Sequence, residues 1–208
     1  TTIEAGLSRA AIQSALPPGG ARNALDCAFW DLEARVTGVP AWRRAGLGSP
    51  RPLLTTQTCH ADAPEKMAQQ ALGHTGARAI KLKLTGQAID AERVRAVRAA
   101  LPDVWLSVDA NQGFTRPFLA ELLPVLVDAR VALIEQPFRV GEEALLEGLR
   151  SPIPVAADES MQTLADVAAL VGRFDVGNIK LDKCGGLTEG LAIARALRAE
   201  GLKVMVGN

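Results

Sequence analysis

Short apolar runs that end in charged or polar residues recur along most of the chain. They are LLTTQTCHAD, AIKLKL, VWLSVDAN, VALIEQPF, IPVAADES, VGNIKLDK and KVMVGN, at residues 53–62, 79–84, 104–111, 131–138, 153–160, 176–183 and 203–208. Markers near five of these ends lie 26, 26, 23 and 22 residues apart in turn: Lys83, Asp109, Glu135, Asp158 and Lys180. An interval of this length holds a strand, a loop and a helix, so the pattern predicts a repeated β/α unit.

Helical patterns lie between the apolar runs, and each has a residue suited to capping its first turn. We expect such caps at Asp90, Thr115, Thr163 and Thr188. Alternating strands and helices imply parallel strands joined by right-handed crossovers. Polar residues end every strand in turn, whereas an open doubly wound sheet gathers its ligand residues at one switch point. The pattern therefore predicts an α/β protein with a TIM-like barrel.

Residues 1–50 have a different pattern. Two helical stretches, residues 2–16 and 23–38, are separated by Pro17-Pro18-Gly19-Gly20, and the second presents Leu25, Phe29, Leu32 and Val36 on one side. We interpret residues 1–50 as the helical end of a preceding domain, and residues 51–208 as strands one to seven of the barrel. Because the chain starts at Thr1, we also expect that the native start is missing.

Composition narrows the possible partners and compartment. Lys+Arg and Asp+Glu both number 23, so the formal net charge is +0, and the chain has few aromatic residues. This balance predicts no nucleic-acid partner, and no apolar run approaches the roughly 20 residues of a membrane span. Three widely spaced cysteines fit a reducing cytoplasm better than a disulfide framework. The sequence leaves the oligomeric state open, a homo-oligomer included.

The run AIKLKL carries two lysines on one face of its expected strand. Lys81 and Lys83 are two residues apart and point together, while Leu82 points to the outer helices. Two close ammonium groups repel, which would lower the pKa of one lysine and make it a usable base. The alternative is a solvated lysine pair on an edge strand, although the apolar flanks favour a buried one.

Carboxylates end the next three runs. Asp109, with Asn111 two residues on, Glu135, and the pair Asp158-Glu159 would converge at the barrel mouth, where their charges require a cation. Oxygen ligands without histidine or thiolate indicate a hard ion, and few ligands with open positions suit Mg²⁺. Strand parity does not choose between Asp158 and Glu159. Each carboxylate taken alone could equally be a helix cap or a loop acid.

The sixth run supplies a lysine on the far side of these carboxylates. Ile179 and Leu181 should face outward, so Lys180 and Asp182 should face inward, whereas Lys183 has the opposite parity. Lysines on both sides of a metal can remove and return a proton next to a carboxylate, because the metal stabilises the enediolate. The alternative for Lys180 is a structural ion pair with a neighbouring carboxylate.

The ordered motifs IKLKL, VDANQGF, IEQPF, ADES and NIKLDKCGG resemble the muconate-lactonizing-enzyme subgroup of the enolase superfamily. The resemblance covers essentially the whole chain, and ARNALDCAFWDLEARVTGVP resembles the last helices of that superfamily's α+β capping domain. It implies a (β/α)7β barrel that is incomplete here, because the last strand is absent. The only histidines, His60 and His74, are not near a late strand end, which disfavours the mandelate-racemase branch.

The resemblance also implies a role for each site residue. Lys83 and Lys180 would be the bases on the two faces of the substrate, and Lys81 would stabilise its carboxylate. The Mg²⁺ ligands would be Asp109, Glu135 and Asp158, with Asn111 and Glu159 as their supports. From its parity with Lys180, and not from the resemblance, we expect Asp182 to join Lys81 in binding substrate. The sequences of these motifs are most similar to those of dipeptide epimerases of the L-Ala-D/L-Glu type, which implies a dipeptide substrate and murein peptide metabolism.

Other functions share these residues. A muconate cycloisomerase, an o-succinylbenzoate synthase or an N-acylamino acid racemase would use the same ligands and lysines. The family's substrate-selecting capping loop and the Asp-x-Asp pair of strand eight lie outside this chain. A non-catalytic fragment or scaffold is the alternative of a different class, although every lysine and carboxylate of the motif set is present. A doubly wound nucleotide binder is disfavoured, since no Gly-rich phosphate loop follows the first strand.

Overall fold

The computed structural model of this chain describes residues 8–207, which form two compact units. We call Leu53–Ser160 with Gly172–Val176 the central unit, and Thr1–Pro52, Met161–Val171 and Gly177–Asn208 the terminal unit. The start of the expected first helix and Asn208, the end of the expected seventh strand, lie outside the described residues. The domain boundary expected at residue 50 stays a prediction.

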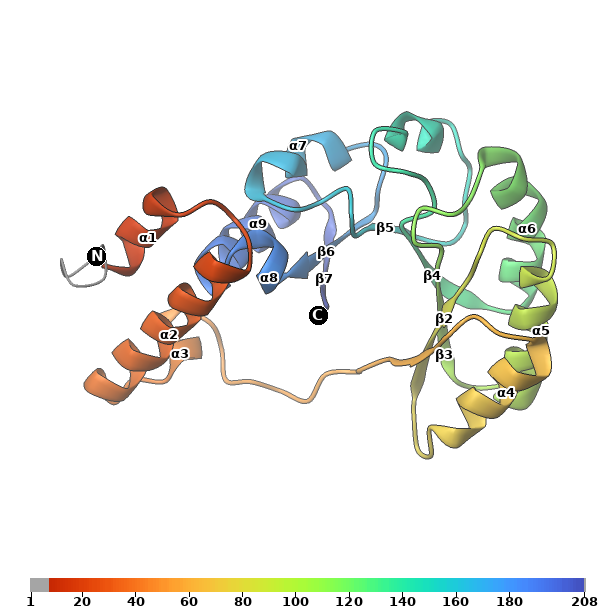
Figure 1. Cartoon of the computed structure of the whole chain (residues 1–208), viewed down its shortest axis with the longest axis horizontal. Coiled ribbons are helices and arrows are strands. Elements are labelled where there is room, and N and C mark those ends of the chain that lie inside the picture. Colours follow the sequence, from red (N-terminus) through yellow and green to blue (C-terminus); the bar gives the residue numbers. More distant parts are fainter. Residues whose placement is uncertain (1–7, 208) are drawn as a thin grey trace. The chain divides into compact units, whose positions relative to one another are not determined.

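The central unit alternates strands with helices, as the periodicity predicts. Strands β1 to β5 are neighbours in chain order, and every pair is parallel. In Figure 1, α4, α5 and α6 lie together along one side of these strands. The bounds are β1 Gln57–Cys59, α4 Pro64–Gly73, β2 Ala79–Lys83, α5 Asp90–Ala100, β3 Trp105–Asp109, α6 Arg116–Asp128, β4 Val131–Glu135, the 3-10 helix η1 Glu143–Leu146 and β5 Val155–Ala157.

Apolar residues at alternate strand positions form the core between this sheet and its helices. Several have no exposed surface: Ile80, Leu82, Leu106, Val108 and Ile134. Burying a side chain of this size contributes about 1.5–3 kcal/mol. The residues between them belong to the opposite face, which holds the lysines and carboxylates. The core therefore sets the register that brings these polar groups to one level.

The helix starts confirm some of the expected caps and correct others. Thr115 caps α6 by accepting from the N–H of Phe118, and Thr163 forms a capping box with Asp166. Asp90 is itself the first residue of α5 and accepts instead from the N–H groups of residues 85–87. The expected cap at Asp90 is therefore wrong, because its carboxylate stabilises the loop that follows β2.

The terminal unit joins the first helices of the chain to its last elements. Arg9 stacks over the ring of Trp30 at 3.8 Å and donates to Thr188. Strands β6 and β7 are neighbours in the sheet. The bounds are α1 Arg9–Ala15, α2 Gly20–Thr37, α3 Ala41–Arg44, the 3-10 helix η2 Leu164–Asp166, α7 Val167–Leu170, β6 Val176–Lys180, α8 Leu181–Cys184, α9 Leu187–Ala199 and β7 Lys203–Gly207.

Helix α2 packs through polar residues, contrary to the expected apolar face. Its buried residues are Arg22, Asp26 and Trp30, whereas Leu32 and Val36 are 54% and 76% exposed. Arg22 donates to the carbonyl of Cys184 at 2.6 Å and to Glu189 at 3.0 Å. The apolar period of this helix predicted the wrong face, because the contact with α8 and α9 is made by hydrogen bonds.

Asp26 of α2 caps the start of α9, which corrects the expected cap at Thr188. Helix α9 begins at Leu187, and Asp26 accepts from the N–H of Thr188 at 2.9 Å and from its hydroxyl at 2.5 Å. Gly186, with a φ of 120°, precedes the helix, and a Cβ there would lie 2.6 Å from the Cβ of Asp26. Only glycine permits this close approach.

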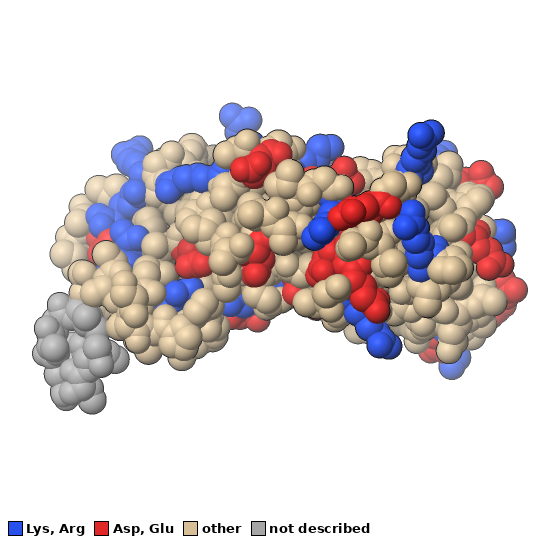
Figure 2. Space-filling model, turned by 90° about the horizontal axis from the view of Figure 1, so that it is seen from above, with Lys and Arg blue, Asp and Glu red and all other residues tan. Residues whose placement is uncertain are grey.

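The surface carries charged side chains of both signs. On the face seen in Figure 2, acidic and basic side chains are interspersed. Within residues 8–207, no helix has both the length and the apolar character that crossing a bilayer requires.

Candidate active site at the ends of strands β2 to β5

The strand register brings Lys83, Asp109 and Glu135 to one level. Lys83 is paired with Asp109 across β2 and β3, and Asp109 with Glu135 across β3 and β4. Leu82, between the lysines, is fully buried on the helix side, whereas Lys81 and Lys83 keep 16% and 29% of their side chains exposed. This confirms the strand parity expected for the lysine pair.

Both ammonium groups contact carboxylates. The Nζ of Lys81 lies 3.2 Å from Oδ2 of Asp109 and 3.2 Å from Oε2 of Glu135. The Nζ of Lys83 lies 2.6 Å from the same Oδ2 and donates to Oδ1 of Asn111 at 2.8 Å. The side chains of Asp109 and Glu135 have no exposed surface. Lys81 therefore bridges two buried carboxylates, and Lys83 reaches one carboxylate and one amide.

The charges of this cluster shift two pKa values. Burial raises the pKa of Glu135, the negative charges of Asp109 and Asp158 raise it further, and Lys81 only partly opposes them. Burial lowers the pKa of Lys81, but the charges of Glu135 and Asp109 outweigh it and raise that pKa above its ordinary value. The lowering expected from lysine–lysine repulsion therefore does not occur at Lys81, because the carboxylates dominate its surroundings.

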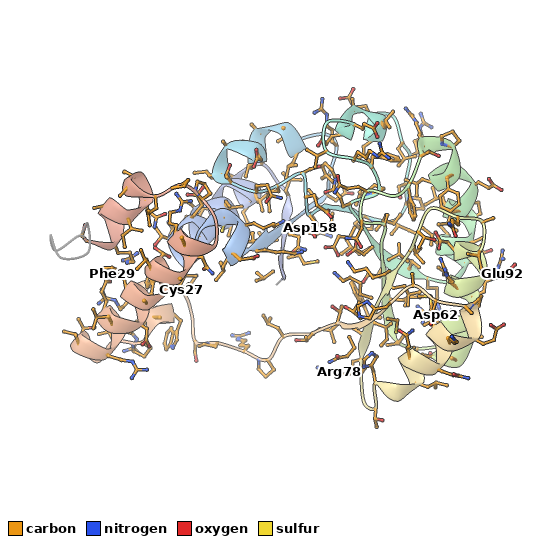
Figure 3. The ribbon with its side chains drawn as sticks, in the orientation of Figure 1. Cys27, Phe29, Asp62, Arg78, Glu92 and Asp158 are labelled. Carbon is orange, nitrogen blue, oxygen red and sulfur yellow. The ribbon has the colours of Figure 1, made fainter. Side chains whose placement is uncertain are left out.

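Asp158 follows β5 directly and is 3% exposed (Figure 3). Its N–H donates to Oε1 of Gln136 at 2.9 Å. Next to it, Glu159 accepts from the Nδ2 of Asn111 at 3.4 Å, and the N–H of Asn111 donates to Asp109. The structure thus brings the two expected supports, Asn111 and Glu159, together beside the carboxylates.

The donor set suits a hard divalent cation by its chemistry. Three buried carboxylates follow successive strands, and two of them raise the pKa of Glu135, so added positive charge would relieve their repulsion. Among residues 8–207, however, no group of three His, Cys, Asp or Glu side chains is arranged to hold a metal. Asp109 and Glu135 turn oxygens toward Lys81 instead. The assignment of these carboxylates as Mg²⁺ ligands stays a prediction.

Lys180 and Asp182 belong to the terminal unit. Lys180 is the last residue of β6 and half-buried, but Leu181–Cys184 is a helix and Asp182 is exposed. The argument that Asp182 shares the inward face of Lys180 is therefore wrong, because the strand ends before it. A Cβ at Gly207 of β7 would lie 3.3 Å from the Cε of Lys180, so this glycine leaves room for the lysine.

Gln136 is a residue of this site that sequence reasoning did not single out. It is 1% exposed, has a positive φ of 36°, and its side chain bonds the segment after β5. The signal available in the sequence was an amide directly after the apolar strand and Glu135, where a buried polar group needs partners. Its partners at residues 158–160 could be identified only in three dimensions.

Comparison with known proteins identifies the type of domain. Residues 64–208 match the family model "Enolase C-terminal domain-like". The chain is 44% identical to the L-Ala-D/L-Glu epimerase of Escherichia coli K12 over 207 residues, which are 99% of this chain and 64% of that protein. It is 40% identical to the N-acetyl-D-glutamate racemase of a Pseudoalteromonas species, over 92% of this chain and 60% of that protein.

A solved structure gives the same result for the fold. The dipeptide epimerase from Methylococcus capsulatus, complexed with Mg and the dipeptide L-Arg-D-Lys, matches with a TM-score of 0.89 at 33% identity. The match covers 96% of this chain and 59% of that chain. The likeness confirms the expected α/β fold of the enolase type. The chain spans about three fifths of the length of these relatives.

Proposed function

We propose that this chain, which belongs to the enolase C-terminal domain-like family, carries the proton-transfer site of an isomerase that acts next to a carboxylate. The observation that carries the proposal is the cluster of Lys81 and Lys83 with Asp109 and Glu135. Lysine is a general base in proteins, and paired carboxylates supply oxygen ligands for a hard cation. Relatives named epimerases and racemases support this chemistry.

The reaction removes a proton from one face of the α-carbon and adds a proton to the opposite face of the same atom. Its intermediate is an enediolate, which carries two negative charges on the substrate's carboxylate oxygens. When bound, Mg²⁺ would supply positive charge to those oxygens and so lower the barrier. Asp109, Glu135 and Asp158 would hold the ion, with Asn111 and Glu159 orienting them.

The proposed roles of the three lysines differ. Lys81 is held by two carboxylates that raise its pKa, so it keeps its proton and suits binding of the substrate carboxylate. Lys83 contacts Asp109 and the neutral amide of Asn111, and it would take the proton on one face of the substrate. Lys180, at the end of β6, would serve the other face. Asp182 stays a predicted substrate-binding residue.

We propose dipeptides with a C-terminal acidic residue as the substrate class. The name of the Escherichia coli relative, L-Ala-D/L-Glu epimerase, supports such a substrate, and the Methylococcus capsulatus structure supports both Mg²⁺ and a dipeptide ligand. Murein peptides are a source of these dipeptides. The free cysteines Cys27, Cys59 and Cys184 support the proposal that the activity is in the cytoplasm. An N-acylamino acid racemase is the second candidate, favoured by the relative named N-acetyl-D-glutamate racemase.

Exchange of the α-proton with solvent tests the proposal. The protein with Mg²⁺ in D2O should replace the C-terminal α-proton of L-Ala-L-Glu or L-Ala-D-Glu with deuterium, as measured by proton NMR. N-acetyl-glutamate in a parallel sample distinguishes the second candidate. Exchange in the dipeptide alone supports the epimerase, and exchange in the acyl amino acid alone supports the racemase. No exchange in a panel of acidic, basic and apolar dipeptides or N-acetyl-glutamate would refute both.

A further inference from the structure

We infer that Gln136 is a positioning residue that holds Asp158, and through it the Mg²⁺ site, in place; this inference rests on the proposed function. Strand β5 ends at Ala157, and its pairing with β4 ends at Glu135 and Ala156. Beyond this pair, the N–H of Asp158 donates to the side chain of Gln136.

The amide of Gln136 uses its full hydrogen-bonding capacity. Its Oε1 accepts from the N–H of Asp158 at 2.9 Å and from the N–H of Ser160 at 3.1 Å. Its Nε2 donates to the carbonyl of Phe138 at 2.9 Å and to the hydroxyl of Ser160 at 2.7 Å. An amide offers two acceptor and two donor positions, so no capacity is left over. Neither a carboxylate nor an apolar side chain of the same length can make all four bonds.

The backbone of Gln136 is also held in place by hydrogen bonds. Its φ of 36° lies in the left-handed region, which is strained for a residue other than glycine. The N–H still donates to the carbonyl of Ala156 at 2.8 Å, and the carbonyl accepts from the N–H of Gln112 at 2.9 Å. Neighbouring strand ends on both sides thus hold the residue in a conformation that a free loop would avoid.

A further hydrogen bond anchors the partner of Gln136. The hydroxyl of Ser160 donates to Oε1 of Glu143 at 2.8 Å, and Glu143 also accepts from the N–H of Gly141 at 3.0 Å. Although burial opposes it, these donors hold the pKa of Glu143 below its ordinary value. The charged carboxylate therefore fixes Ser160, which orients the amide that holds Asp158.

This position matters because a metal ligand must be held closely. Asp158 is buried, and its charge reaches Glu135, whose pKa it helps to raise. Groups that orient metal ligands through hydrogen bonds typically change metal affinity by about 10–100-fold when removed. A residue that only stabilises the fold would change the unfolding free energy and leave the affinity unchanged. The two effects can be measured separately.

The test compares Gln136→Met with Gln112→Met in the protein without substrate. Methionine keeps the length of the side chain and removes its hydrogen bonds. Gln112 also has a positive φ and lies beside the site, but among residues 8–207 its Oε1 accepts only from the N–H of Val140, so it is the matched control. Calorimetric titration with Mg²⁺, and Mn²⁺ spectroscopy as a second probe, give the dissociation constants. Unfolding in EDTA gives the stability of each variant.

We expect Gln136→Met to bind Mg²⁺ and Mn²⁺ about 10–100-fold more weakly, and Gln112→Met to bind as the wild type does. Unchanged metal affinity in Gln136→Met, whatever its stability, would overturn the inference. If that variant does not fold, Ser160→Ala replaces it. That variant loses the hydroxyl link but keeps the backbone bond, and it should weaken metal binding in the same direction, while unchanged affinity again overturns the inference. A wild type that binds neither ion refutes the proposed function together with the inference.

Discussion

Lys81 and Lys83 are two residues apart in β2, yet their surroundings suit them to different tasks. Lys81 bridges Asp109 and Glu135, and its pKa is raised, so it is a permanent positive charge at neutral pH. Lys83 shares Asp109 but has the neutral Asn111 as its second partner and is more exposed. These surroundings support the proposal that Lys81 binds the substrate carboxylate and Lys83 moves the proton.

The two-base assignment can be tested with single substitutions. Lys83→Ala and Lys180→Ala should each abolish epimerisation, because neither face can be served by the other lysine. We expect one of them to keep exchange of the α-proton from a single substrate enantiomer, because the remaining lysine still serves one face; NMR in D2O measures this exchange. Lys183→Ala is the matched control, since Lys183 lies in α8 beyond the end of β6, and we expect it to keep activity. Full epimerisation by either alanine variant at Lys83 or Lys180 would contradict the assignment.

At the scale of elements, α2 and α9 are joined by a cap that comes from another helix. Asp26 satisfies the N–H and the hydroxyl of Thr188 in the first turn of α9, and Gln13 donates to the same carboxylate at 2.8 Å. A helix start leaves several N–H groups without intrahelical partners, and a carboxylate there also interacts favourably with the helix dipole. The packing of α2 thus stabilises α9, which follows Lys180 and α8 along the chain.

We expect Asp26→Ala to lower the free energy of unfolding by about 1–3 kcal/mol, because it leaves a half-buried hydroxyl and the N–H of Thr188 without their acceptor. Asp31→Ala on the same helix is the control. Within the described part of the chain, Asp31 pairs only with Arg35, and both side chains are more than 60% exposed, so the change should stay within about 0.5 kcal/mol. Urea unfolding of the two variants measures the difference. Equal unfolding free energies of Asp26→Ala and Asp31→Ala would show that the cap contributes nothing to stability.

At the scale of the whole molecule, the buried carboxyl of Glu135 makes the stability of the metal-free protein depend on pH. The raised pKa of Glu135 means that the folded protein binds more protons than the unfolded chain at a pH just above the ordinary pKa of glutamate. Stability contributed by this group is therefore present at lower pH and is lost as the pH rises through that range. Lys81 does not add to this pH dependence near neutral pH. Its pKa is raised, so the stability that it contributes is lost only in alkaline solution.

Glu135→Gln should therefore stabilise the protein in EDTA and abolish its response to Mg²⁺. The stability difference between variant and wild type should grow as the pH rises from 4 to 7, because glutamine does not ionise. Addition of Mg²⁺ at 100 times its dissociation constant should stabilise the wild type by about 2.7 kcal/mol and leave the variant unchanged. About 1 kcal/mol moves the melting temperature of a chain of this size by about 2–4 °C, which calorimetry resolves. A variant less stable than wild type in EDTA at pH 7 would argue against the burial cost.

Local patterning was sufficient for the repeated units of the fold. The apolar runs and their spacing predicted β2 to β7, because strands of a parallel sheet covered by helices are short apolar segments separated by a helix. Parity likewise predicted that Lys81 and Lys83 point together, and register with β3 and β4 then brought Asp109 and Glu135 beside them. These features depend on residues that are close in the chain or on strand ends that a parallel sheet aligns.

Where contacts join distant parts of the chain, only the tertiary structure decided. The α2 pattern of Leu32 and Val36 pointed to the wrong face, since Asp26 and Arg22 find their partners more than 160 residues later. The raised pKa of Lys81 likewise depends on carboxylates of neighbouring strands, and three of the four bonds of Gln136 depend on the segment after β5. The sequence by itself determined which residues end each strand, because short-range periodicity encodes burial. The charge state and support of those residues were decided by the fold, because hydrogen bonds and electrostatic interactions depend on distances in space.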